Sequence, residues 1–300
     1  MGKLMSNDPN PERRGMTLTR PAFSLLPALR RIAAHACAAA CVVLAAAAAT
    51  TAAAADNWSR IRPGLFQDRA IAEDKGQLLE LVTPVRAEDA AVVPVAIHAR
   101  PPQDRGLTVR RLYLIIDNNP APLAAVFNLT SDLGQADIET RVRVEEYTSI
   151  RVVAELSDGS LHMTSRFVKA SGGCSAPAGK DPAAAAAGLG RMKLTLERTP
   201  QLNQPLLAQL MIRHPNSSGL AMDQVSRLYA PPHYVRHIDV AYNGRPVMSA
   251  DTDISISENP NFRFSFVPRQ EGTLTVDAVD SNDLTFKAAI QVRPGEINAN

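Results

Sequence analysis

The chain has 300 residues, 45% of them hydrophobic and 21% charged, which is enough for one or two ordinary domains. Its formal net charge is +2, but residues 1–55 hold six Lys or Arg and two Asp or Glu, so the remainder carries a net charge of −2. Nucleic-acid binding needs a basic patch, and this balance predicts none. DNA and RNA are therefore excluded as expected partners.

Residues 1–55 are typical of an export signal. Arg20, Arg30 and Arg31 precede an alanine-rich apolar run over residues 32–55, which ends in small residues ahead of a polar segment. We expect this signal to be cleaved, leaving a periplasmic protein with no stable membrane span. Export by the general secretory route and by the twin-arginine route both stay open.

The cysteines point to one special thiol. Cys37 and Cys41 lie in the predicted signal, so Cys174 is the only cysteine predicted for the mature chain. Exported proteins usually carry paired cysteines, so a single thiol must stay free, be capped reversibly or pair with another molecule. Gly172 and Gly173 stand directly before it and give the backbone a wide conformational range. The sequence therefore predicts a reactive thiol on a flexible arm.

Short strands dominate the expected structure on both sides of this thiol. A short helix is expected within residues 56–77. Alternating apolar residues then predict strands over 78–82, 91–98, 109–117, 124–129, 139–147, 150–156 and 161–168. The second half predicts strands over 192–198, 206–213, 235–242, 245–249, 253–257, 262–267, 274–280 and 286–292. This pattern predicts an all-β protein with two immunoglobulin-like β-sandwiches.

Two details of this pattern are specific. Over residues 139–147 the alternation places Val142 and Val144 on one face of the strand and Arg143 and Glu145 on the other. Asn243-Gly244 and Asp158-Gly159 predict hairpin turns.

The expected domain boundaries follow from these elements. After the signal of residues 1–55, the first sandwich covers 56–169 and the second covers 191–300. Residues 170–190 form the arm and linker, including a minimal helix predicted over 181–188.

Histidines raise the question of a metal site. His233 and His237 are four residues apart, and His214 lies further back in the chain. These spacings lack the compact arrangement of a zinc site, so surface or turn positions are expected and no metal or cofactor is predicted. The sequence also has no Gly-x-Ser-x-Gly nucleophile elbow. We therefore do not expect a hydrolase.

Several segments together carry a family resemblance. They are Arg86–Ala90 with Val93–Val95, Asp117–Pro120, Thr140–Val144, Lys169–Ala178, Ile212–Asn216, Gly219 and Ile256–Asn261. With these segments the chain resembles the sulfur carriers SoxY and SoxZ of periplasmic thiosulfate oxidation, fused into one polypeptide. More closely, it resembles the quinoprotein dehydrogenase-associated SoxYZ-like carrier proteins.

The resemblance implies a specific role for the thiol. In that family a Gly-Gly-Cys-Gly-Gly arm ends SoxY, and its cysteine holds sulfur intermediates covalently while partner enzymes act on them. Carried over, Cys174 is the attachment site, and Gly172, Gly173 and Ser175 belong to the swinging arm. The resemblance therefore implies a carrier that is not itself an enzyme. This chain departs from the family in placing Ser175 and Ala176 after the cysteine, and in placing the cysteine inside the chain.

Two kinds of partner and two kinds of function stay open. The resemblance implies periplasmic sulfur-oxidising enzymes, or a quinoprotein dehydrogenase and its cytochrome, as partners. The alternative function is a non-covalent periplasmic binding or assembly module for a PQQ-dependent quinoprotein dehydrogenase, in which Cys174 is secondary. Substitution of Cys174 separates the two.

Overall fold

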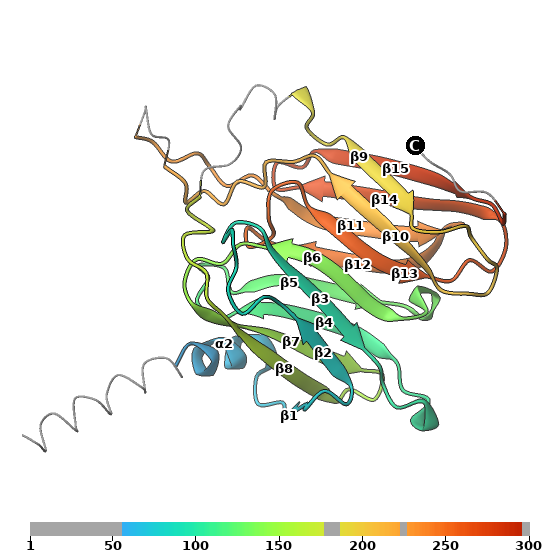
Figure 1. Cartoon of the computed structure of the whole chain (residues 1–300), viewed down its shortest axis with the longest axis horizontal. Helices are drawn as coiled ribbons and strands as arrows, with labels where there is room; N and C mark the ends of the chain where they lie inside the picture. The colour runs from blue at the N-terminus through green and yellow to red at the C-terminus, as the bar shows by residue number, and fades with distance from the viewer. Residues whose placement is uncertain (1–55, 177–186, 223–226, 296–300) are drawn as a thin grey trace, which may run out of the picture. The chain divides into compact units, whose positions relative to one another are not determined.

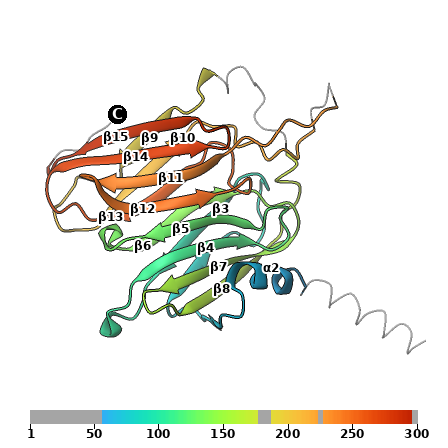
Figure 2. The same ribbon diagram turned by 180° about the vertical axis from the view of Figure 1, so that it is seen from behind.

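Strands are the main regular secondary structure of the computed structural model, which describes residues 56–176, 187–222 and 227–295 (Figures 1 and 2). The helical elements are α2 (Asp56–Phe66), η2 (Gln103–Arg105) and η3 (Ser131–Leu133). The strands are β1 (Ile71–Glu73), β2 (Leu79–Val82), β3 (Val93–Ala99), β4 (Val109–Ile116), β5 (Leu123–Leu129), β6 (Ala136–Val142), β7 (Thr148–Leu156), β8 (Leu161–Val168), β9 (Met192–Leu196), β10 (Leu206–Ile212), β11 (Val235–Tyr242), β12 (Arg245–Thr252), β13 (Asn261–Phe266), β14 (Gly272–Asp280) and β15 (Thr285–Val292). The all-β prediction is confirmed. Within the described ranges, no helix has the length and apolar character needed to cross a membrane.

The strands form two sheets that enclose one hydrophobic core. The larger sheet has the order β1-β8-β7-β4-β5-β12-β11-β14-β15, and the smaller has the order β2-β3-β6-β13-β10-β9. Alternate residues of each strand point inward, as in β3, where Val93, Val95 and Ile97 are buried. Period-two alternation of this kind is what makes one face of a sheet apolar.

Both sheets continue from the first half of the chain into the second. In the larger sheet β5 pairs antiparallel with β12, and in the smaller sheet β6 pairs antiparallel with β13. The buried cluster accordingly draws residues from both halves, including Phe127 and Phe262, whose rings meet edge to face with centroids 6.2 Å apart. The two predicted sandwiches are thus joined edge to edge through backbone hydrogen bonds.

The turns confirm the predicted hairpins, whereas some strand ends differ. Asn243 and Gly244 have φ values of 49° and 76° between β11 and β12, as a tight two-residue hairpin requires. The strand predicted over 139–147 ends at Val142, and residues 253–257 form an isolated bridge at Ile256 instead of a strand. The helix predicted over 181–188 lies almost wholly outside the described residues.

Helix α2 covers the outer face of the larger sheet. Its Phe66 is buried with Ile115, Val153 and Met163, and Trp58 packs against the same cluster. The guanidinium of Arg151 also lies 4.9 Å from the centroid of the Trp58 ring. A short helix is marginal by itself in water, so this apolar contact accounts for its presence.

Candidate functional site around Cys174

The backbone after β6 is the surface on which the cysteine segment docks. The N–H of Val144 donates to the carbonyl of Ala90 at 2.8 Å, and the carbonyl of Val144 accepts the N–H of Gly173 at 2.9 Å. One residue on, the carbonyl of Glu145 accepts the N–H of Gly172 at 2.8 Å. The residues that lead to Cys174 are thus held by main-chain hydrogen bonds.

Gly173 is required by this close approach. A Cβ atom at this position would lie 2.1 Å from the carbonyl oxygen of Ala90 and 2.7 Å from the nitrogen of Val144. Both obstacles are backbone atoms, so they cannot move aside cheaply. Gly172 has a φ of 81°, in the left-handed region that glycine adopts most readily.

The carboxylate of Glu145 accepts three hydrogen bonds from Cys174 and Ser175. Its Oε2 accepts the N–H of Cys174 at 2.8 Å and the N–H of Ser175 at 3.1 Å. Its Oε1 accepts the hydroxyl of Ser175 at 2.9 Å. Hydrogen bonds to an ionised acceptor are stronger than neutral ones, so Glu145 is the main clamp on this segment.

The second half of the chain supplies the other side of the site. The loop between β10 and β11 brings Ser218 to Cys174, and the Ser218 hydroxyl donates to the Cys174 carbonyl. The same loop presents the carbonyl of Asn216 to the side chain of Arg143. Cys174 therefore lies between elements of both halves.

Arg143 is a buried cation beside the cysteine. Its side chain is 2% exposed, and its Nη1 donates to the carbonyl of Gly173 at 3.2 Å. Its Nη2 donates to the carbonyl of Asn216 at 3.2 Å. Its Nε is buried and has no hydrogen-bond partner among the described residues. Burial lowers the pKa of Arg143, opposed by the nearby charges of Cys174, Glu258 and Asp89.

Asn119 fixes Arg143 and Glu145 in place. Its Nδ2 donates to the carbonyl of Arg143 at 2.7 Å and to the Ser255 hydroxyl at 2.9 Å, and its Oδ1 accepts the N–H of Glu145 at 2.9 Å. A buried amide with donors and acceptors satisfied in this way rigidifies the backbone around it.

The thiol is buried and protonated in this arrangement. Cys174 is 0% exposed. Burial, with a smaller contribution from the charge of Glu145, raises the pKa of the thiol from an ordinary 9.0 to about 12, against the opposing charge of Arg143. Because the thiolate is the reactive form, the docked thiol is a poor nucleophile at neutral pH.

The predicted reactive thiol on a flexible arm is not the arrangement in this structure, where Cys174 is buried and its neighbours are bonded to the body of the protein. Gly172 and Gly173 are bonded to the backbone of residues 144 and 145, and Ser175 is bonded to Glu145. Glycine was interpreted as a source of mobility, whereas Gly173 here permits a close backbone contact. Of the predicted linker, residues 177–186 lie outside the described residues.

The structure brings two of the three candidate histidines together. Nε2 of His233 lies 2.7 Å from Oδ2 of Asp280, and Nε2 of His214 lies 3.4 Å from the same oxygen. His214 is buried, not at the surface as expected. Its Nδ1 accepts the N–H of Asn216 at 3.0 Å, so the Nε2 of the neutral ring carries the proton.

This cluster has the composition of a metal site, since ligand atoms of His214, His233 and Asp280 lie within 4.8 Å of one another. A protonated Nε2 is a donor and not a ligand, so the hydrogen bonds favour a structural network. His237 lies apart, with its Nδ1 2.7 Å from Asp251 and its Nε2 3.1 Å from Asp239.

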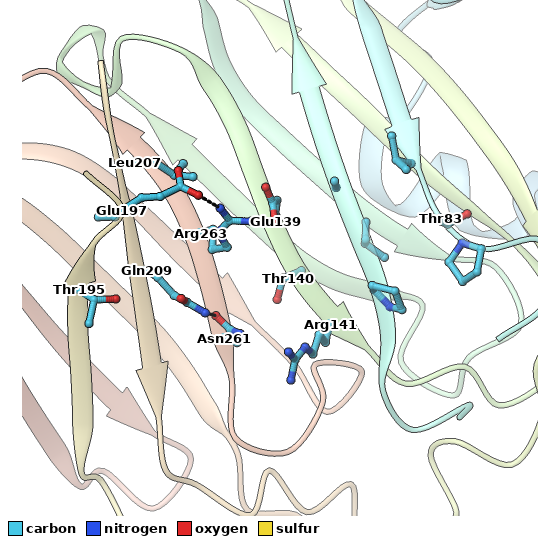
Figure 3. Close-up of a pocket in the computed structure, with 16 residues that line it drawn as sticks. Thr83, Glu139, Thr140, Arg141, Thr195, Glu197, Leu207, Gln209, Asn261 and Arg263 are labelled. Atoms are coloured by element: carbon cyan, nitrogen blue, oxygen red, sulfur yellow. Dashed lines mark hydrogen bonds and ion pairs between the residues drawn. The ribbon is translucent and has the colours of Figure 1, made fainter. Parts of the chain in front are cut away.

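A groove of about 690 Å³ crosses the smaller sheet where the two halves meet (Figure 3). Arg263 lies in it and pairs with Glu139 of the first half at 2.7 Å and with Glu197 of the second half at 2.6 Å. Gln209 and Asn261 form a further hydrogen bond of 3.0 Å there. The groove is a feature distinct from the cysteine site.

Family models match both halves of the chain. The model "Sulfur oxidation protein SoxY" matches residues 62–174, and "Sulphur oxidation protein SoxZ" matches residues 193–291. The chain is a fused SoxYZ-like protein. It therefore belongs with carriers of the sulfur-oxidation system and not with its catalysts, and the SoxY match ends at Cys174 itself.

Solved structures show more distant similarity. The sulfur carrier SoxY from Chlorobium limicola f thiosulfatophilum is 21% identical, with a TM-score of 0.33 over 40% of this chain and 96% of that one. A superoxide reductase (neelaredoxin) from Ignicoccus hospitalis is 16% identical, with a TM-score of 0.26 over 38% of this chain and 88% of that one. Among curated proteins, none matches this SoxYZ-like chain.

Several segments that carry the resemblance meet at the cysteine. Ala90, Asn119, Arg143 and Asn216 come from four of them, and each contributes a contact to the site. Sequence reasoning missed Glu145 and Ser218 as site residues. Glu145 stands one position beyond the resembling segment at 140–144, and that position was the only signal that could have identified it.

Proposed function

We propose that this SoxYZ-like protein carries sulfur intermediates covalently on Cys174 and presents them to partner enzymes in the periplasm. The observation that carries the proposal is the SoxY match, which ends at the cysteine that both halves of the chain enclose. The structure then corresponds to a docked state of the arm, and loading takes place in an undocked state.

The high pKa of the docked thiol supports two states. A thiol with a pKa of about 12 is almost entirely protonated at neutral pH. Attack on a sulfur compound needs the thiolate, and a partner needs access to the sulfur. Undocking supplies both, because it removes the burial that raises the pKa.

The contacts that hold the arm are few enough to be broken by a partner. Three hydrogen bonds to the Glu145 carboxylate and one from Ser218 hold Cys174 and Ser175. Three more hold the two glycines before them: the N–H groups of Gly172 and Gly173 each donate one, and the carbonyl of Gly173 accepts one from Arg143. Each contributes about 1 kcal/mol net, or somewhat more to a charged acceptor. Binding to a partner enzyme supplies a free energy comparable to the sum of these contributions.

The reach of the undocked arm is short. Lys169 still bridges to Arg86 in the body of the protein, and Cys174 lies five positions further along the chain. At roughly 3.5 Å per residue the thiol can extend at most about 17 Å from this anchor. That length suits a narrow cleft in a partner enzyme.

The chemistry of loading requires an electron acceptor. With thiosulfate as the cargo, the sulfur of Cys174 forms a bond to the outer sulfur of thiosulfate, releasing one proton and two electrons. The partner system must accept those electrons, which is work for a cytochrome-linked enzyme. Sulfur-oxidising enzymes are the proposed partners, and association with a quinoprotein dehydrogenase stays a prediction.

Complementation tests the covalent role against the non-covalent module. The gene should be deleted in its host and replaced by the wild type, by Cys174→Ser or by the control Ser165→Ala on β8. We expect Cys174→Ser to fold, as judged by a cooperative melting transition, and to restore none of the sulfur-dependent growth. Full restoration by Cys174→Ser would contradict the covalent role and favour the binding module.

A further inference from the structure

Arg143 is a buried cation without a matching anion. Arginine is almost never fully buried unless its charge is paired. Here the side chain is 2% exposed, its two Nη atoms donate only to backbone carbonyls, and within the described residues its Nε has no partner. The site thus contains a buried positive charge that bonds two backbone carbonyls but keeps one unsatisfied N–H donor.

This unpaired donor is adjacent to the thiol. The guanidinium bonds to the carbonyl of Gly173, the residue directly before Cys174. Its charge lowers the pKa of the thiol, although burial and the charge of Glu145 raise that pKa more. A group attached to Cys174 would therefore be held close to a cation in surroundings where charge interactions are strong.

We propose that Arg143 binds the anionic end of the sulfur group carried on Cys174 while the arm is docked. This inference rests on the proposed carrier function and specifies the cargo that the docked state retains. The chemical class is an S-thiosulfonate or S-sulfonate, whose terminal oxygens accept hydrogen bonds from the guanidinium. A neutral adduct of similar size gains nothing from Arg143.

The acidic groups nearby do not cancel this role. Both oxygens of Glu145 are engaged with the N–H groups of Cys174 and Ser175 and with the Ser175 hydroxyl. Asp89 and Glu258 act on Arg143 through their charges, yet neither forms an ion pair with it in the part of the chain that the structure describes. The cargo would supply the close anion that these groups do not.

The test compares an anionic with a neutral adduct on the same cysteine. A Cys37→Ser/Cys41→Ser background leaves Cys174 as the single thiol. In urea, tetrathionate loads it: the thiolate bonds to one inner sulfur, the central S–S bond breaks, thiosulfate leaves with the electron pair, and the thiol proton goes to water. Methyl methanethiosulfonate loads the neutral S-methylthio group in the same way, with methanesulfinate leaving.

Protection of the adduct is the readout. Each adduct is refolded by removal of urea, and its cleavage by dithiothreitol is timed in folded and in urea-unfolded protein. The ratio of the two rates corrects for intrinsic reactivity. Protection is the cleavage rate in unfolded protein divided by the rate in folded protein. We expect it to be about tenfold or more greater for the thiosulfonate than for the methylthio adduct, because a charge-assisted hydrogen bond in a buried site stabilises the docked adduct by a free energy that corresponds to at least that ratio.

Variants assign the difference to Arg143. Arg143→Gln should abolish the excess protection of the anionic adduct, and Arg143→Lys should retain part of it. Arg141→Gln is the matched control, because Arg141 is exposed two residues earlier and should change nothing. Equal protection of both adducts in the wild type would overturn the proposal even if the Arg143 variants failed to fold. Loss of sulfur-dependent growth in Cys174→Ser is measured separately, so failure of the carrier function can be told apart from failure of the Arg143 proposal.

Discussion

Two buried polar clusters differ in how completely their groups are paired. In the cluster around Asp280, one carboxylate oxygen accepts from His233 and His214, and the other accepts the N–H groups of Asn282 and Leu284. In the cluster around Cys174, Arg143 keeps a buried Nε without a described partner, and the thiol is protonated. Both clusters lie at the end of a strand, and both include the loop between β10 and β11.

This difference indicates that the Asp280 cluster is structural and that the Cys174 cluster is a binding site. Buried polar groups in proteins are normally satisfied, and a fully bonded network rigidifies the fold. The unsatisfied Nε of Arg143 beside the thiol instead indicates that a ligand binds there reversibly. The composition of the Asp280 cluster resembles a metal site, yet its hydrogen bonds indicate structure, whereas the Cys174 cluster, with its unpaired cation, indicates a ligand.

The largest expected effect comes from Gly173→Ala. Its Cβ would collide with the backbone of Ala90 and Val144, so the arm cannot dock and the thiol becomes exposed. We expect reaction of Cys174 with a disulfide reagent such as DTNB to accelerate by about a hundredfold, as for loss of about 3 kcal/mol of docking contacts. Slow reaction in Gly173→Ala, unchanged from the wild type, would show that this glycine does not hold the docked state.

Asp280→Asn tests the other side of the comparison. Burial alone would raise the pKa of Asp280, but hydrogen bonds from His233, Leu284 and Asn282 outweigh it and leave the pKa below its usual range. We expect Asp280→Asn to lower the free energy of unfolding by about 2–3 kcal/mol, because a buried charged acceptor is lost. Denaturation in urea measures this change.

Zinc provides the control for the same cluster. Because the Nε2 of His214 carries a proton, added Zn²⁺ should leave the melting temperature of the wild type unchanged. A stoichiometric rise with zinc would make the Asp280 cluster a metal centre and remove the contrast between the two sites.

The pH dependence of Cys174 alkylation distinguishes a docked thiol from a free one. Burial raises the pKa of the docked thiol to about 12 from 9.0, so docking is favoured below pH 9.0 and is lost as the pH rises toward 12. The alkylation rate of Cys174 by iodoacetamide should therefore keep rising about tenfold per pH unit beyond pH 9. Levelling off near pH 9, as for a free thiol, would contradict a docked state.

The smallest expected effect is that of Ser218→Ala. It removes the hydroxyl that donates to the Cys174 carbonyl and leaves the three bonds to Glu145 intact. The loss of about 1 kcal/mol should accelerate thiol modification roughly fivefold. Ser217→Ala, one residue earlier in the same loop, should leave the rate of modification unchanged.

The sequence was sufficient for most strands because they obey a two-residue period. It failed at Arg143, which that period places on the exposed face, since the chain leaves β6 at Val142 and then pairs with the loop around Ser255 and Ile256. A contact with residues more than a hundred positions away leaves no mark on local alternation.

The candidate site was predicted in part for the same reason. Cys174 was identified from its glycines and from the family resemblance, but its docked state depends on Glu145 and Ser218, which come from separate loops. Likewise, Asp280 joins His214 and His233 only through the tertiary fold. Spacing along the chain could not bring these residues together.

Mass spectrometry of the protein purified from its own cells during growth on a reduced sulfur compound tests the account most directly. The peptide that contains Cys174 should carry a sulfur adduct, such as a thiosulfonate, in a measurable fraction of molecules. An unmodified thiol in every molecule throughout growth would contradict the assignment of Cys174 as the carrier.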